Sequence, residues 1–299
     1  KKLLLKSKPL NMKTNFTFLI LLLYAMVFSS CSQAEKTKSM NNAEGDVKRI
    51  LELIPIGIEE DTLEVHWHPK VTNTQKDVIY DIIHRLILVE GGTFTMGCND
   101  CESYMGPAHE VTVNTFYIYK FEIMQRYWYE LQQLDPTKFS RQDHPVVNVS
   151  WNDCQQFIQC LNDLTGLSFR LPTEAEWEFA ARGGNLSKNY LYSGSDSIKK
   201  VGWFVDNSFN QTHSITTMSP NELGIYNMSG NVWEWCLDWY APYTAELQVN
   251  PTGPENGSAK VYRGGSYMDV ASYLRIENRN SGIPDYKMNN LGFRIVLEK

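Results

Sequence analysis

The chain has 299 residues, of which 42% are hydrophobic and 21% charged, and its formal net charge is −6. A chain of this length can bury a sizeable core in one large domain with an extension. The acidic balance argues against nucleic acid as a partner, because an acidic surface repels phosphates.

The first segment has the features of an export signal. Lys13 precedes an apolar run at Phe16–Phe28, which is shorter than the roughly 20 residues that span a membrane and is typical of a secretory signal. The run ends in FSSCS, so we expect residues 1–31 to be a signal peptide with a lipobox, with lipidation at Cys31. An ordinary signal peptide with an incidental cysteine is the alternative. Residues 1–11 are then not part of the native mature sequence.

Export and lipidation have two consequences. Cleavage before Cys31 would remove five lysines and leave a net charge of −11. The mature protein would be held on a membrane through its lipid, in the bacterial cell envelope, with its folded part at the periplasmic or surface face.

Residues 32–85 are predicted to form a tether and a small N-terminal extension. Ser32–Asp46 is polar and has no apolar period, as in an unstructured tether. The stretch LEVHWH, which begins at Leu63, alternates like a strand. His66 and His68 within it are two possible metal ligands without a third, so we interpret them as surface residues of that strand.

Residues 86–299 are predicted to form the main domain. Its first part shows clear periodicity. The expected elements are strands on either side of a Gly-Gly turn in Leu86–Gly97, a strand in His109–Met124, a helix in Ile123–Leu134, a helix capped by Asn152 or Asp153 and ended by Gly166, and a helix that begins at Thr173 and ends at Gly183. After Asn185 the periodicity fades, which predicts an α+β domain with short strands, a few helices and much irregular structure.

Five cysteines follow Cys31. Cys98 and Cys101 bracket a tight turn and either bridge or remain two free thiols. Cys154 and Cys160 fall in a helical pattern about 240° apart around the axis, so we expect them not to pair with each other.

Four separated motifs carry a family resemblance. They are GGTFTMG, then HPVVNVSWNDC with RLPTEAEWEFAARGG, then GIYNMSGNVWEW, then RGGSY with NRN and NNLGFR. In this order they resemble the formylglycine-generating enzymes, also called sulfatase-modifying factors. The resemblance implies a C-type-lectin-like fold over residues 86–299.

The resemblance also implies a catalytic pocket, but this chain departs from it. In the family, two cysteines after the GGSY run bind copper(I) and oxidise a substrate cysteine to formylglycine. Asp269 and Leu274 hold those two places here. A carboxylate and an alkyl group cannot replace the soft thiolate pair that copper(I) prefers, so we do not expect copper or formylglycine formation. The other pocket positions carried over are Trp233, Ser266 and Tyr273.

A structural calcium site is a further implication of the resemblance. Its ligands would be the Asn227 side chain, the backbone carbonyls of Gly230 and Val232, and the Glu234 carboxylate. Such hard oxygens suit calcium. The alternative is that the glycine and the tryptophans of this motif build only a tight turn and core.

Charged residues around the helix after Thr173 are predicted to hold the fold together. Three glutamates lie in its first turns, where the helix dipole favours negative charge. We expect the arginines before and after the helix to pair with them. These residues are Arg170, Glu174, Glu176, Glu178 and Arg182.

Two functions remain open. The first is a non-catalytic, lipid-anchored binding or assembly protein of the envelope. It would recognise an envelope protein or a glycan through Tyr267–Arg279 and Ser281–Asn290, which are rich in adaptable polar side chains. The alternative is a divergent oxidoreductase or metal-dependent enzyme, in which Asp269 acts as a base or a hard metal ligand.

Overall fold

The structure is a computed structural model that describes residues 2–4, 62–134 and 141–299. The predicted signal peptide, Cys31 and the tether lie outside the described residues, apart from β1 (Lys2–Leu4), which forms a two-stranded sheet with β2 (Thr62–Glu64). None of the helices in the described ranges has the length and apolar character needed to cross a membrane. Residues 64–299 pack together as one unit.

The strand predicted for LEVHWH extends only through Glu64, and a helix follows that was not predicted. α3 (Asn73–His84) starts at Thr72, whose hydroxyl accepts from the amide of Gln75 while the Gln75 side chain accepts from the amide of Thr72. Its buried aliphatic residues recur at helical spacing, and α3 packs on α4 (Gln125–Gln132). The capping pair and the spacing were both readable in the sequence.

The later helices begin and end at capping residues. α5 (Trp151–Thr165) is capped by Ser150, so the predicted cap at Asn152 or Asp153 is wrong. Asp153 is instead the third helical residue, and its carboxylate accepts from the Ser150 amide in a reciprocal pair. α5 ends at Gly166, which has φ of 69°, as predicted. α6 (Glu174–Ala181) is capped by Thr173, again as predicted.

The remaining strands form three small sheets. The sheet β11-β10-β8-β12 comprises Arg279–Gly282, Lys260–Arg263, Trp233–Trp239 and Leu291–Phe293. The sheet β3-β6-β13-β7 comprises Leu86–Val89, Phe116–Tyr119, Val296–Glu298 and Phe169–Arg170. The sheet β4-β5-β9 comprises Gly92–Met96, His109–Val113 and Gln248–Val249.

The single strand predicted for His109–Met124 is therefore two strands in different sheets. β5 pairs with β4, and β6 pairs with β3 and β13. The break falls at Asn114 and Thr115, where the Asn114 amide bonds the side chain of Asn250 rather than a neighbouring strand. The alternation continues across this break, so the pattern alone could not reveal it.

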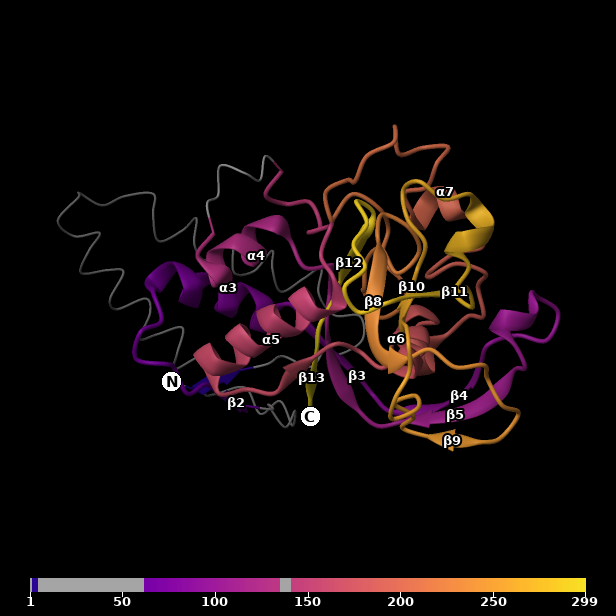
Figure 1. The fold of residues 1–299 in the computed structure, drawn as a ribbon, viewed down its shortest axis with the longest axis horizontal. Coiled ribbons are helices and arrows are strands. Elements are labelled where there is room, and N and C mark those ends of the chain that lie inside the picture. The colour runs from indigo at the N-terminus through magenta and orange to yellow at the C-terminus, as the bar shows by residue number, and fades with distance from the viewer. Residues whose placement is uncertain (1, 5–61, 135–140) are drawn as a thin grey trace, which may run out of the picture. The chain divides into compact units, whose positions relative to one another are not determined.

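α6 is the centre of the domain. All eight of its residues are buried, and the helix contacts β4, β5, β8 and β10. In Figure 1 it lies between the sheet of β8 and β10 and the hairpin of β4 and β5. Trp177 and Phe179 project from it into the main apolar core. A helix buried on every side needs partners for its three glutamates, and these partners shape the site described below.

The short elements complete the fold. They are η1 (Ser103–Met105), η3 (Gly184–Leu186), α7 (Ile198–Val201) and η4 (Ala271–Leu274). Cys98 and Cys101 form a disulfide before η1, which decides between the two alternatives left open by the sequence. Cys154 and Cys160 are free and do not pair with each other, as predicted. The domain is thus α+β, with much irregular chain between short elements, as predicted.

Candidate functional site

Three of the predicted pocket positions lie together at the start of β8. The Asp269 carboxylate accepts a hydrogen bond from the Trp233 indole at 2.9 Å and another from the hydroxyl of Ser266. Ser266 in turn accepts from the side chain of Asn290 at 2.8 Å. Asp269 is half-buried, whereas Ser266 is fully buried. Hydrogen bonds thus fix the carboxylate at the place where the resemblance puts the first cysteine.

The other two predicted positions do not join this group. Tyr273 is exposed on η4. Leu274 is fully buried and packs with Tyr192, Val201 and Phe204 in a small apolar cluster. The place of the second cysteine is therefore part of a hydrophobic core.

Two glycines make room for Leu274. A Cβ built on Gly230 would lie 2.7 Å from a methyl group of Leu274, and one built on Gly265 would lie 2.8 Å from it. Both glycines also have positive φ, which disfavours any other residue. The leucine fills the space that the two glycines leave.

The glutamates of α6 form the predicted ion pairs and two pairs that were not predicted. Arg170 binds Glu176 through two hydrogen bonds of 2.7 Å, and Arg182 binds Glu178. Burial by itself would raise the pKa of Glu178, but the guanidinium groups of Arg182 and Arg263 hold it below its ordinary value.

The two additional partners come from the last forty residues. Arg263 of β10 pairs with Glu178, and Arg279 of β11 pairs with Glu174. Both arginines belong to the motifs RGGSY and NRN. These motifs therefore bind the C-terminal sheet to the central helix, which supports the prediction that the glutamates serve fold cohesion.

The predicted calcium ligands lie next to a buried acidic group. Both oxygens of Glu234 accept hydrogen bonds of 2.6 Å from Arg294, and one also accepts from Trp177 at 2.7 Å. Glu122, which was not predicted, accepts hydrogen bonds from the side chains of Asn227 and Asn231. Burial, and next the charge of Glu234, raise the pKa of Glu122 to about 8.

Of the two side-chain ligands predicted for calcium, Asn227 fits this role better than Glu234. Asn227 donates through its side-chain nitrogen to Glu122 and to the carbonyl of Ile215. Its side-chain oxygen is buried and has no hydrogen-bond partner among the described residues, which is unusual for a buried polar atom and suits a metal ligand. Glu234, in contrast, is already neutralised by Arg294, so an ion here would share this carboxylate.

Other candidate metal ligands do not converge. Within residues 2–4, 62–134 and 141–299, no group of three or more His, Cys, Asp or Glu side chains could hold a metal ion. His66 and His68 are exposed, as the interpretation of them as surface residues requires.

Comparisons with known proteins identify the family. A model of the sulfatase-modifying factor enzyme 1-like domain matches residues 81–299. A formylglycine-generating enzyme of Streptomyces coelicolor is 39% identical over 173 residues, which are 52% of each chain. The chaperone protein LppX of Paenibacillus barcinonensis is 30% identical over 264 residues, which cover 72% of this chain and 89% of LppX.

A solved structure supports the fold. Treponema denticola variable protein 1 superimposes with a TM-score of 0.65 at 27% identity, over 72% of this chain and 95% of that one. The chain spans only about half the length of the formylglycine-generating enzymes it matches. The fold is the α+β, C-type-lectin-like fold that the motifs predicted. With the family model covering most of its length, the chain belongs to the sulfatase-modifying factor family.

Proposed function

We propose that this protein is a non-catalytic binding or assembly protein of the cell envelope, anchored by a lipid at Cys31. The observation that carries the proposal is the state of the two positions where the resemblance puts catalytic cysteines. Asp269 is bonded to Trp233 and Ser266, and Leu274 is buried in an apolar cluster. Neither side chain supplies a thiolate.

A loop face beside Asp269 supports binding to another protein. We define the loop face as residues 267–279 and 281–290. Its exposed large apolar side chains are Met268, Val270, Tyr273, Ile283 and Tyr286. Surfaces that expose several large apolar groups are typical of protein interaction sites.

A neighbouring loop extends the apolar surface. The amide of Val205 donates to the carbonyl of Asp269 at 3.0 Å, and the hydroxyl of Ser208 donates to the carbonyl of Tyr267 at 2.8 Å. Phe209 on this loop is 85% exposed. The similarity to LppX, which is named a chaperone protein and matches over most of its length, favours a protein partner over a glycan.

The proposal predicts that the protein has no oxidase activity and that its partner depends on the loop face. Full-length protein with Cys31→Ser is mixed with copper(I) and a cysteine-containing peptide, and oxygen consumption is recorded. We expect the rate of a metal-free control. Turnover of cysteine to formylglycine above that control would establish the alternative, a divergent oxidoreductase that uses Asp269.

A second experiment tests partner binding with two double variants in intact cells. Val270→Ser with Ile283→Ser lies on the loop face, and Leu134→Ser with Leu186→Ser lies outside it. A photocrosslinker at Met268 is expected to capture one discrete partner, with a yield roughly tenfold lower in the loop-face variant, as for the loss of a few buried contacts. Equal yields in both variants would contradict the loop face as the binding surface.

A structural calcium ion is part of the proposal. Asn227 would hold it through the unpartnered side-chain oxygen, together with Glu234 and the carbonyls of Gly230 and Val232. The ion would add positive charge beside the buried acidic groups of Glu122 and Glu234 and so stabilise the fold, without a catalytic step.

Asn227→Gly tests the calcium site. Glycine tolerates the left-handed backbone of this position, where φ is 56°. Calcium at about 100 times its Kd should stabilise the wild type by about 2.7 kcal/mol and raise its Tm by roughly 5–10 °C. We expect this shift to vanish in Asn227→Gly and to persist in the matched control Asn231→Gly, which removes a neighbouring amide at φ of 63°. A shift that survives in Asn227→Gly would exclude this residue as a ligand.

A further inference from the structure

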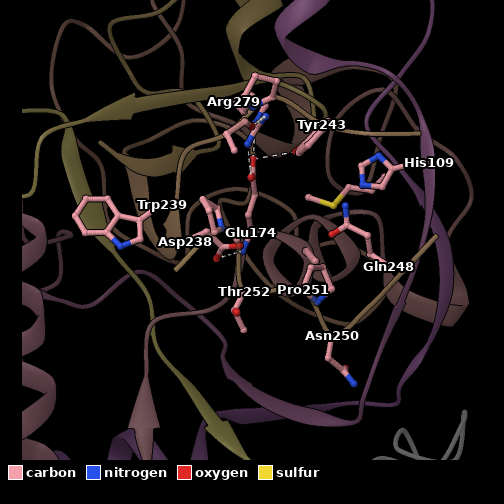
Figure 2. A pocket seen from close by; sticks show the side chains of 16 residues that line it. His109, Glu174, Asp238, Trp239, Tyr243, Gln248, Asn250, Pro251, Thr252 and Arg279 are labelled. Atoms are coloured by element: carbon pink, nitrogen blue, oxygen red, sulfur yellow. Dashed lines mark hydrogen bonds and ion pairs between the residues drawn. The ribbon is translucent and has the colours of Figure 1, made fainter. Parts of the chain in front are cut away.

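A cavity lies at the start of α6, and none of the exposed apolar side chains of the loop face lines it. It has a volume of about 480 Å³, within the usual range for small-ligand sites. Its walls come from the end of β8, the N-terminus of α6, β5, β11 and the loop around β9. Figure 2 shows Asp238, Gln248 and Thr252 around this cavity, with Glu174 between them.

Most charges that line the cavity are already paired. The Arg279 guanidinium binds both oxygens of Glu174, at 2.7 and 2.5 Å, and donates to the carbonyl of Ala241. Tyr243 donates its hydroxyl to Glu174 at 3.0 Å (Figure 2). This side of the cavity is therefore rigid and nearly neutral.

Asp238 is the exception. It is 5% exposed, and it forms no ion pair within 4 Å in the described ranges. One oxygen, Oδ2, accepts from the amide of Glu174 at 2.8 Å at the start of α6. No other described residue donates a hydrogen bond to Oδ1, although Asp238 lines the cavity. The Lys260 ammonium acts on Asp238 through its charge, but it donates to the carbonyl of Leu237 at 2.8 Å and forms no ion pair with Asp238. The helix dipole offsets at most half a charge, so Asp238, when ionised, has no directly paired cation among the described residues.

The cavity offers little to a sugar ring. The aromatic face of Trp239 is covered by the ammonium group of Lys260 at 3.8 Å, and that of Tyr243 by Arg279 at 3.8 Å. A guanidinium group fits poorly as well, because it binds best to two free carboxylate oxygens. A compact ammonium group needs only one oxygen, and the cavity lining also carries the side-chain oxygen acceptors of Gln248 and Thr252.

We propose that this cavity binds a primary ammonium group, as on a lysine side chain, by pairing it with Oδ1 of Asp238. The ammonium supplies the missing positive charge, and the polar rim accepts its remaining hydrogen bonds. This site uses none of the exposed apolar residues of the loop face. A negative result at either site therefore leaves the proposal for the other unaffected.

The pH dependence gives a distinctive signature. Burial, and next the charge of Glu174, raise the pKa of Asp238 to about 8. The carboxylate is thus mostly protonated at pH 7 and mostly ionised at pH 9, so affinity for an amine should rise about tenfold over this interval. The other charged or titratable groups around Asp238 are Glu174, Glu176, His109, Lys260, Tyr243 and Arg279.

The experiment uses full-length protein with Cys31→Ser and titration calorimetry at pH 9. The probes are Nα-acetyl-lysine methylamide, its neutral analogue with norleucine, the arginine analogue and butylamine. We expect the lysine probe to bind at least tenfold more tightly than the norleucine and arginine probes. If butylamine binds as tightly as the lysine probe, the ligand need only be a free primary amine. If butylamine binds much more weakly, the ligand is a lysine side chain within a peptide.

Two variants complete the test. Asp238→Asn keeps the acceptor for the Glu174 amide and should lower affinity for the lysine probe at least tenfold and remove its pH dependence. Thr252→Val, on the exposed rim, should lower affinity for the lysine probe about threefold. This variant still tests the site if Asp238→Asn does not fold. Equal binding of the norleucine probe, or binding of the lysine probe unaffected by either variant, would overturn the proposal.

Discussion

Replacing Arg294 with methionine is expected to cost about 3–5 kcal/mol of unfolding free energy, measured by urea denaturation. Arg294 and Glu234 are both fully buried, and the guanidinium binds both carboxylate oxygens. Arg294 also lowers the pKa of Glu122, which burial and Glu234 raise. Without the arginine, Glu234 would be a buried carboxylate with no cation, next to the acidic group of Glu122.

The control variants separate charge from packing. Arg85→Met breaks a partly exposed pair with Asp81 and should cost less than about 1 kcal/mol. Adding Glu234→Gln to Arg294→Met should recover part of the loss, because it removes the charge that was left unpaired.

The same variant should also depend on pH. Its deficit relative to the wild type should be smaller at pH 5 than at pH 8, because a protonated Glu122 no longer repels Glu234. A deficit below about 1 kcal/mol at every pH would contradict the view that this pair is essential to the core.

Leu274→Ala is expected to cost about 2–5 kcal/mol, as for other buried leucines. The side chain is fully buried between Tyr192, Val201 and Phe204, and it lies against Gly230 and Gly265, which have no side chains that could fill the gap. Truncation should therefore leave a cavity rather than a repacked core.

The adjacent Tyr273 is a matched control. It is exposed on the same short helix, and Tyr273→Ala should change stability by less than about 0.5 kcal/mol. If Leu274→Ala changed stability as little as Tyr273→Ala, Leu274 would not be a core residue. A role for its position in a pocket would then have to be considered.

These two results bear on function as well as stability. A leucine that supports the fold cannot be exchanged freely, so the position of the second cysteine is committed to packing. The loop face beside it carries exposed apolar side chains, whereas the cavity at Asp238 is polar and charged. The protein thus presents two surfaces of different chemistry, and the two can be tested independently.

The sequence predicted the structure well where residues interact with near neighbours along the chain. Thr173 starts a helix and Gly166 ends one through hydrogen bonds to residues a few positions away, so their effect was predictable. The error at Ser150 has the same origin, since serine and aspartate exchange hydrogen bonds within one turn. α3 carried both a capping pair and helical spacing, and was missed although the signal was present.

By itself, the sequence determined the family and the α+β class, because these depend on residue identities in a fixed order. Only the tertiary structure decided which arginine pairs with which glutamate, that Leu274 is core, and that Asp238 lies unpaired in a cavity. Each of these depends on the burial of groups far apart in the chain, such as Glu174 and Arg279. Burial sets both the cost of a charge and the identity of its partner, and no local pattern contains that information.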